Sequence, residues 1–124
     1  GMYGNIENSY NGHDFINYIK KQMDIRHIRH SKILNKRIKK VAVLGGSGSF
    51  CINNAIEKKI DCYITSDLKY HDFFKANNKI LLLDIGHYES DKFTKELIYN
   101  YLLKKIPKFA CIIANTNTNP VNYY

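Results

Sequence analysis

The chain has 124 residues, 44% of them hydrophobic, and a formal net charge of +8. This length is enough for one domain with a buried core, and the hydrophobic content excludes an intrinsically disordered chain. No apolar run approaches the roughly 18 residues that cross a membrane. The three cysteines are odd in number and widely spaced, so we expect free, buried thiols in a reducing cytoplasm, not a disulfide framework or a zinc site.

The positive charge raises the question of nucleic-acid binding. Basic residues concentrate between positions 26 and 40, but only three of the 19 basic residues are arginines. Proteins that read nucleic acid usually rely on arginine for bidentate contacts. We therefore expect no specific nucleic-acid partner and only a non-specific attraction to phosphates.

The first 36 residues predict one helix and one strand. Residues 1–12 are rich in glycine and asparagine, which is typical of a loop or tail. Residues 13–24 place apolar side chains on one face of a helix. Residues 25–30 alternate as in a short edge strand, and a basic loop follows at 31–36.

A strand at residues 40–44 leads into a glycine-rich turn at 45–49 and a helix at 50–59, which together begin a βα unit. The turn is neither a phosphate-binding loop of the Walker type nor a complete dinucleotide-binding motif. Two interpretations remain open. It is either a tight turn that uses small residues for close packing, or an anion- or substrate-binding pocket at the start of the helix.

A second buried strand is predicted at residues 62–65, and Ser66 or Asp67 can cap the helix that follows it. This turn brings Lys69 and His71 to the carboxyl edge of the sheet, where ligands of open α/β sheets bind. A lone histidine is usually structural. Several strand ends that deliver titratable side chains to one edge indicate a site.

A third apolar strand at residues 80–83 leads into a turn that carries His87, Glu89 and Asp91. An imidazole and a carboxylate four residues apart can converge on a cation where the backbone begins to coil, since four helical residues rise only about 6 Å. The alternative is a histidine that covers the end of the sheet beside solvated acids.

The remaining residues predict a helix and a last strand. Ser90 is a natural N-cap for an amphipathic helix at residues 92–106, Pro107 ends it, and residues 109–114 form the strand. The predicted order is α-β-β-α-β-α-β-α-β. We expect a single α/β domain over residues 1–124, a layered fold with a mostly parallel or mixed sheet flanked by helices.

Four motifs occur in the order that they have in one known family. They are residues 41–49 (VAVLGGSGS), 63–72 (YITSDLKYHD), 84–91 (DIGHYESD) and 117–120 (NTNP). With them the chain resembles the carboxyl-terminal half of the Nif-three-like dinuclear-metal proteins, the family of the bacterial GTP cyclohydrolase 1 type 2 homologues.

The resemblance implies a ring-shaped homohexamer of two-lobed subunits with two divalent metal ions in each pocket, for which Zn, Mn, Fe and Ni are about equally suited. It makes His87 a metal ligand and Asp91 a second one. The family prefers glutamate at that second position, and aspartate is about 1.5 Å shorter, so Glu89 is a candidate substitute. The other family ligands belong to the amino-terminal half and have no match here, so we expect these residues alone to bind metal weakly or not at all.

The resemblance also implies a function, a metal-dependent hydrolase that acts on a nucleotide-like or otherwise phosphorylated small molecule. In that role His71 would be an acid/base and Lys69 an anion contact. The alternative is a non-catalytic metal-binding or regulatory scaffold whose ring assembly is its function. A basic nucleic-acid-binding module is the third hypothesis.

Overall fold

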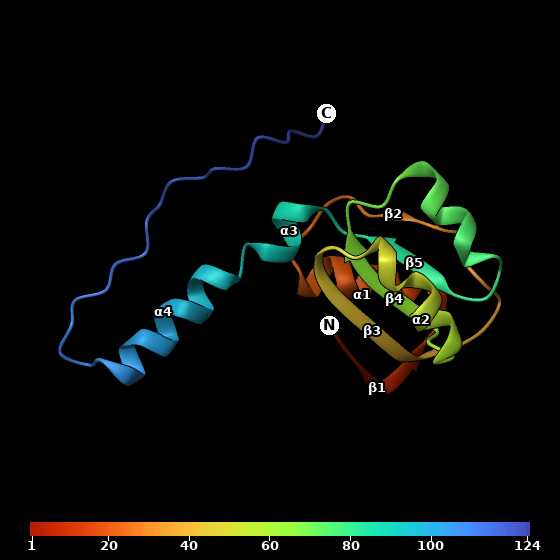
Figure 1. Ribbon diagram of the computed structural model, residues 1–124, viewed down its shortest axis with the longest axis horizontal. Coiled ribbons are helices and arrows are strands. Elements are labelled where there is room, and N and C mark those ends of the chain that lie inside the picture. Colours follow the sequence, from red (N-terminus) through yellow and green to blue (C-terminus); the bar gives the residue numbers. More distant parts are fainter. The chain divides into compact units, whose positions relative to one another are not determined.

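The computed structural model describes residues 1–124 and contains one five-stranded sheet with helices on its two faces (Figure 1). The strands are β1 (Met2–Tyr10), β2 (Arg29–His30), β3 (Ile38–Ser47), β4 (Cys62–Ser66) and β5 (Leu81–Asp84). The α-helices are α1 (Gly12–Gln22), α2 (Ile52–Glu57), α3 (His87–Asp91) and α4 (Thr94–Lys105). Two 3₁₀ helices are η1 (Ser49–Cys51) and η2 (Tyr70–Ala76).

The sheet is mixed, with the strand order β1-β3-β4-β5-β2. The three central strands β3, β4 and β5 run parallel, and β1 and β2 are antiparallel edge strands. Parallel strands need helical crossovers, which place their carboxyl ends at one edge of the sheet. The predicted α/β class with a layered, mixed sheet is confirmed.

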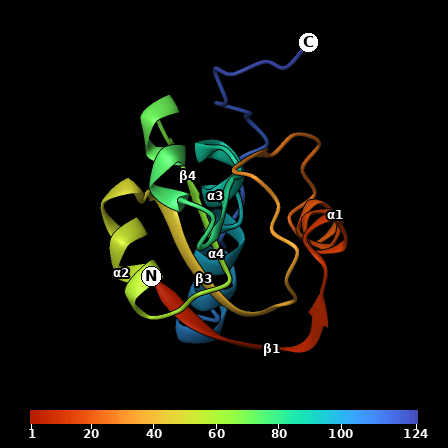
Figure 2. The same ribbon diagram turned by 90° about the vertical axis from the view of Figure 1, so that its right-hand side faces the viewer.

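Successive side chains of the central strands are buried on opposite faces of the sheet. Helix α1 covers one face and α2 the other (Figure 2). The face under α1 includes Val41, Cys62, Leu81 and Leu83. The face under α2 includes Ala42, Tyr63, Ile80 and Leu82. This two-sided burial explains why the strands are continuous apolar runs in the sequence.

The prediction that residues 1–12 form a loop or tail is wrong, because β1 (Met2–Tyr10) pairs with β3 in antiparallel register, with Tyr3 opposite Ala42. Most of this strand is exposed at the sheet edge, so it needs no apolar alternation, and its hydrogen bonds come from β3. The glycines and asparagines that suggested a turn are tolerated there.

The predicted strand at residues 109–114 is also wrong, because none of these residues pairs with another strand. Phe109 is 63% and Ile112 90% exposed. An apolar run makes a strand only when a neighbour supplies hydrogen bonds along its length. The strand predicted at residues 25–30 shrinks to the two residues of β2 for the same reason.

Two predicted helices differ in their starts. The helix predicted at residues 50–59 is divided into η1 and α2. Ser90 lies inside α3 and is not the cap of the next helix, since the N-cap residue of α4 is Phe93. The helix predicted at 92–106 is otherwise confirmed as α4.

Contacts divide the chain into two compact units, residues 1–90 and residues 91–124. The first unit holds the whole sheet. The second holds α4, none of whose residues is buried. No helix in the chain is both long enough and apolar enough to cross a membrane. The three cysteines form no disulfide; Cys62 is buried as predicted, whereas Cys51 and Cys111 are only half-buried.

Candidate functional site

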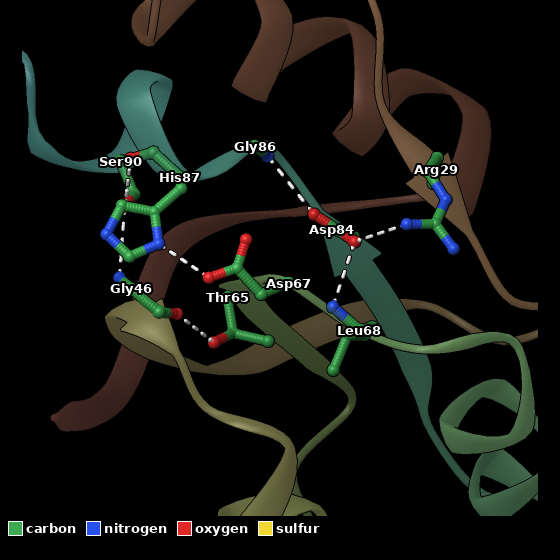
Figure 3. Close-up of polar contacts among 9 residues, drawn as sticks. All are labelled: Arg29, Gly46, Thr65, Asp67, Leu68, Asp84, Gly86, His87 and Ser90. Carbon is green, nitrogen blue, oxygen red and sulfur yellow. Dashed lines mark hydrogen bonds and ion pairs between the residues drawn. The ribbon is translucent and has the colours of Figure 1, made fainter. Parts of the chain in front are cut away.

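The carboxyl ends of β4 and β5 bring a histidine and an aspartate into contact (Figure 3). His87 begins α3 after a sharp turn at Gly86, whose φ of 88° is natural for glycine. Asp67 follows β4 with a φ of 57°, a left-handed conformation that aspartate tolerates better than most residues. Because β4 and β5 are parallel neighbours, the two turns meet, and Nδ1 of His87 lies 2.5 Å from Oδ2 of Asp67.

The His87–Asp67 pair is accessible to ligands, since the side chains are 57% and 44% exposed. A carboxylate on Nδ1 fixes the orientation of the ring and favours the tautomer with its proton on Nδ1. Metal-binding histidines are usually held in this way by a carboxylate or carbonyl on the nitrogen that does not face the metal. The pair can therefore present Nε2 as an oriented ligand.

Asp84 connects the His87 turn to the rest of the sheet. Its carboxylate is only 5% exposed and accepts hydrogen bonds from the backbone N–H groups of Leu68 and Gly86, each at 3.1 Å. It also accepts a hydrogen bond from Nη1 of Arg29 at 3.0 Å. One buried side chain thus fixes the turn after β4, the turn before His87 and the edge strand β2 (Figure 3).

The glycine-rich segment at residues 45–49 is only in part the predicted turn, because β3 continues to Ser47. Three side chains hold this segment. The Ser90 hydroxyl accepts the Gly46 N–H at 3.0 Å and donates to the His87 carbonyl at 2.8 Å. Thr65 donates to the Gly46 carbonyl and Tyr63 to the Gly48 carbonyl. Burial raises the pKa of the Tyr63 hydroxyl, which keeps it in the neutral, donating form. These contacts favour the close-packing interpretation of this turn over the anion pocket.

Replacing Gly48 with alanine tests that interpretation. A Cβ at Gly48 would overlap the Thr65 hydroxyl and the Tyr63 hydroxyl and lie 2.6 Å from Cδ2 of Leu44. We expect the free energy of unfolding to fall by about 1–3 kcal/mol, as for other overpacked sites, measured by urea denaturation. Gly4→Ala is the control, since its Cβ would meet nothing within 4 Å, and equal losses in both variants would contradict close packing.

The other predicted site residues lie in different surroundings. His71 is exposed in η2, where its ring is 5.2 Å from that of Tyr70. Lys69 is the N-cap residue of η2, and its backbone N–H donates to the Asp72 carboxylate at 2.9 Å. The predicted cap by Ser66 or Asp67 is therefore wrong. A hydrogen bond from Lys75 lowers the pKa of Asp72 and keeps it an ionised acceptor.

The acids predicted as metal ligands lie in α3. Glu89 is half-buried, and Asp91 is exposed at the end of the helix and begins the second unit. No group of three or more His, Cys, Asp or Glu side chains in the chain could hold a metal ion. The residues therefore fit a metal only in part, because the oriented imidazole of His87 is a suitable ligand but a complete centre needs more.

Sequence reasoning identified His87 but missed the residues that hold it. Asp67 was interpreted only as a helix cap, and Asp84 and Ser90 received no role at the site. The available signal was their position, since Asp67 and Asp84 each stand where a parallel strand ends. Strand order was needed to show that these ends are neighbours.

Comparison with known proteins identifies relatives along the whole chain. The family model of Duf34/NIF3 (NGG1p interacting factor 3) matches residues 1–120. A GTP cyclohydrolase 1 type 2 homolog of Staphylococcus epidermidis is 33% identical over 127 residues, covering 99% of this chain and 35% of the relative. The corresponding Campylobacter jejuni protein is 31% identical over 120 residues, covering 96% of this chain and 47% of its own length.

Solved structures show the same fold. Staphylococcus aureus protein SA1388 superposes with a TM-score of 0.82 and 28% identity, covering 98% of this chain and 41% of that one. A Bacillus cereus protein related to NIF3 gives a TM-score of 0.81 and 25% identity, covering 98% and 35%. The chain thus spans less than half the length of these relatives. The family predicted from the four motifs is confirmed: this chain belongs to the Duf34/NIF3 family.

Proposed function

We propose that this chain carries part of the metal site of a metal-dependent hydrolase, with His87 as its principal ligand. The contact between His87 and Asp67 carries this proposal, because an exposed imidazole held by a carboxylate at a sheet's carboxyl edge has the usual form of a metal ligand. The names of relatives as GTP cyclohydrolase 1 type 2 homologs support a nucleotide-like or otherwise phosphorylated substrate.

Further residues have assigned roles in this proposal. Asp91 and Glu89 are the additional carboxylate ligands, His71 an acid/base and Lys69 a contact for an anionic substrate. A bound divalent ion would supply a water whose pKa is lowered to about 7, which makes hydroxide available for hydrolysis at neutral pH. The resemblance assigns the remaining ligands to the amino-terminal half of the family fold, which has no match in residues 1–124. By the same resemblance we propose a cytoplasmic homo-oligomer, a hexamer in the complete form.

Metal titration of the chain, observed through the imidazole NMR resonances of its five histidines, tests the proposal. Substoichiometric Mn²⁺ should broaden the His87 resonances first, even where binding is weak, and His87→Gln should abolish this selective broadening. His13→Gln is the matched control, since His13 is exposed on α1 and does not belong to the turns that follow β4 and β5. Binding that survives His87→Gln, or no binding to any chain, would contradict the proposal.

A second candidate is the non-catalytic metal-binding scaffold. The absence of a three-ligand group in the chain favours it, because a partial site can bind an ion without assembling a catalytic centre. Metal-dependent hydrolysis of a nucleoside triphosphate that is lost in His87→Gln would support the hydrolase. Metal bound through His87 without any hydrolysis would support the scaffold.

A further inference from the structure

A groove lies between the β2 segment and helix η2. Figure 3 shows Arg29, which lines it, on the opposite side of Asp84 from His87. Its volume is about 460 Å³, within the range of about 300–1,000 Å³ typical of small-ligand sites. Arg29 and Lys32 line one wall, and Tyr70, Phe73 and Phe74 line the other. In Figure 1 these are the orange segment at β2 and the green helix beside it. No aspartate or glutamate lines the groove, so its charged side chains are cationic.

Arg29 is held in place without being buried. Its Nη1 bonds to the buried Asp84 carboxylate, and its Cζ lies 5.1 Å from the centre of the Phe73 ring. The side chain is nevertheless 61% exposed. A guanidinium has five N–H donors, so a group fixed through one of them still has donors for a bidentate contact with phosphate. The arginine therefore has the form of an anion contact prepared before the ligand arrives.

The opposite wall is a cluster of exposed aromatic rings. Tyr70 is 70% and Phe74 65% exposed, and their ring centres are 5.3 Å apart at an angle of 77°. The His71 ring stacks on Phe74 at 6.3 Å and 28°. Exposed clusters of large apolar side chains are uncommon unless they bind something. Rings of this kind stack with nucleobases with little regard to base identity.

We propose that this groove binds a nucleoside phosphate, with its base packed against Tyr70 and Phe74, face to face with one ring and edge to face with the other, and its phosphate held by Arg29 and Lys32. The aromatic wall and the cationic wall match the two chemically different parts of such a ligand. The groove's role as a substrate site rests on the proposed function, whereas the binding itself requires no metal. Asp84 joins the two regions, since it bonds both Arg29 and the Gly86 N–H before His87.

Calorimetry of the complete chain in EDTA tests the binding, with adenosine 5′-monophosphate (AMP), adenosine and inorganic phosphate as separate ligands. AMP should bind at least about tenfold more tightly than either part, because it uses both walls. Backbone amide resonances of residues 70–74 should shift. Since metal is excluded, failure here leaves the His87 proposal untouched, and failure of metal binding leaves this one untouched.

Two pairs of variants separate the walls. Arg29→Gln and Phe74→Ala should each weaken AMP binding about tenfold. The matched controls Arg26→Gln and Phe50→Ala, which remove the same groups from exposed positions outside the groove, should change it less than about twofold. Lys32→Gln should weaken AMP binding about threefold. This variant still tests the cationic wall if Arg29→Gln destabilises the fold by removing the hydrogen bond from Arg29 to Asp84.

Several results would overturn the proposal. If adenosine or phosphate binds as tightly as AMP, only one wall of the groove contributes to binding. An oligonucleotide that binds more than about a hundredfold tighter, with affinity falling steeply with salt, would assign the groove to single strands. Self-association of the chain that Phe74→Ala abolishes would assign it to a second copy. Unchanged AMP binding in Lys32→Gln and Phe74→Ala would place AMP elsewhere.

Discussion

Replacing Asp84 with alanine is expected to lower the free energy of unfolding by about 3 kcal/mol. The substitution removes a carboxylate that is 5% exposed and accepts three hydrogen bonds. The Leu68 N–H is then buried without its acceptor, which carries most of the cost. The lost ion pair with Arg29 contributes less, because that side chain is largely in water and screened. Chemical denaturation followed by circular dichroism measures the change.

Asp84→Asn and Glu57→Ala make the Asp84 result specific. Asparagine keeps one oxygen acceptor but turns the other group into a donor, so we expect about half the loss. Glu57 is an exposed carboxylate at the end of α2, and its removal should change stability by less than about 0.5 kcal/mol. Equal stability in wild type and Asp84→Ala would show that Asp84 does not organise the two turns.

Replacing Asp67 with glycine is expected to weaken metal binding at His87 by about 10–100-fold while leaving the fold intact. Without the carboxylate on Nδ1, the ring loses its fixed orientation and some of its basicity. Glycine is the suitable replacement because the backbone φ at this position is 57°, which alanine adopts only with strain. Metal affinity is measured by Mn²⁺ titration, and the imidazole tautomer of His87 by ¹⁵N NMR.

Asp24→Gly is a matched control for Asp67→Gly, since Asp24 also has a left-handed φ, 47°, but follows helix α1 and not β4 or β5. Its metal affinity should equal that of the wild type. In Asp67→Gly the His87 tautomer should shift toward a proton on Nε2, which a merely structural role of Asp67 would not produce. Unchanged affinity together with an unchanged tautomer would contradict the positioning role.

The centre of the sheet was predictable because burial on both faces leaves an unmistakable apolar run. Residues 40–44, 62–65 and 80–83 were each assigned as strands and correspond to β3, β4 and β5. The edge strand β1 was not predictable from composition, since an exposed strand needs only a neighbour's hydrogen bonds. Residues 109–114 show the converse, an apolar run that has no neighbouring strand.

The candidate site was predictable only as single residues. His87 was identified because it follows a strand in a turn rich in acids. Its contact with Asp67 joins residues 20 positions apart, and the bond between Ser90 and Gly46 joins residues 44 apart. These pairings follow from the parallel order of β3, β4 and β5, which no local pattern contains. The metal roles of His87, Asp91 and Glu89, and the catalytic roles of His71 and Lys69, remain predictions.

The strand order has a consequence for how the chain acquires its structure. No two neighbouring strands are joined by a hairpin, since β1 pairs with β3 across α1 and β2, and β2 pairs with β5 across 55 residues at Arg29 and Asp84. The central strands are joined by crossovers. Every pairing therefore requires the closure of a long loop before any ladder bond forms, which slows folding relative to helical proteins of this size. During synthesis β2 cannot pair until β5 has emerged from the ribosome. The β2 edge of the sheet is therefore the last part to form, although β2 is made early.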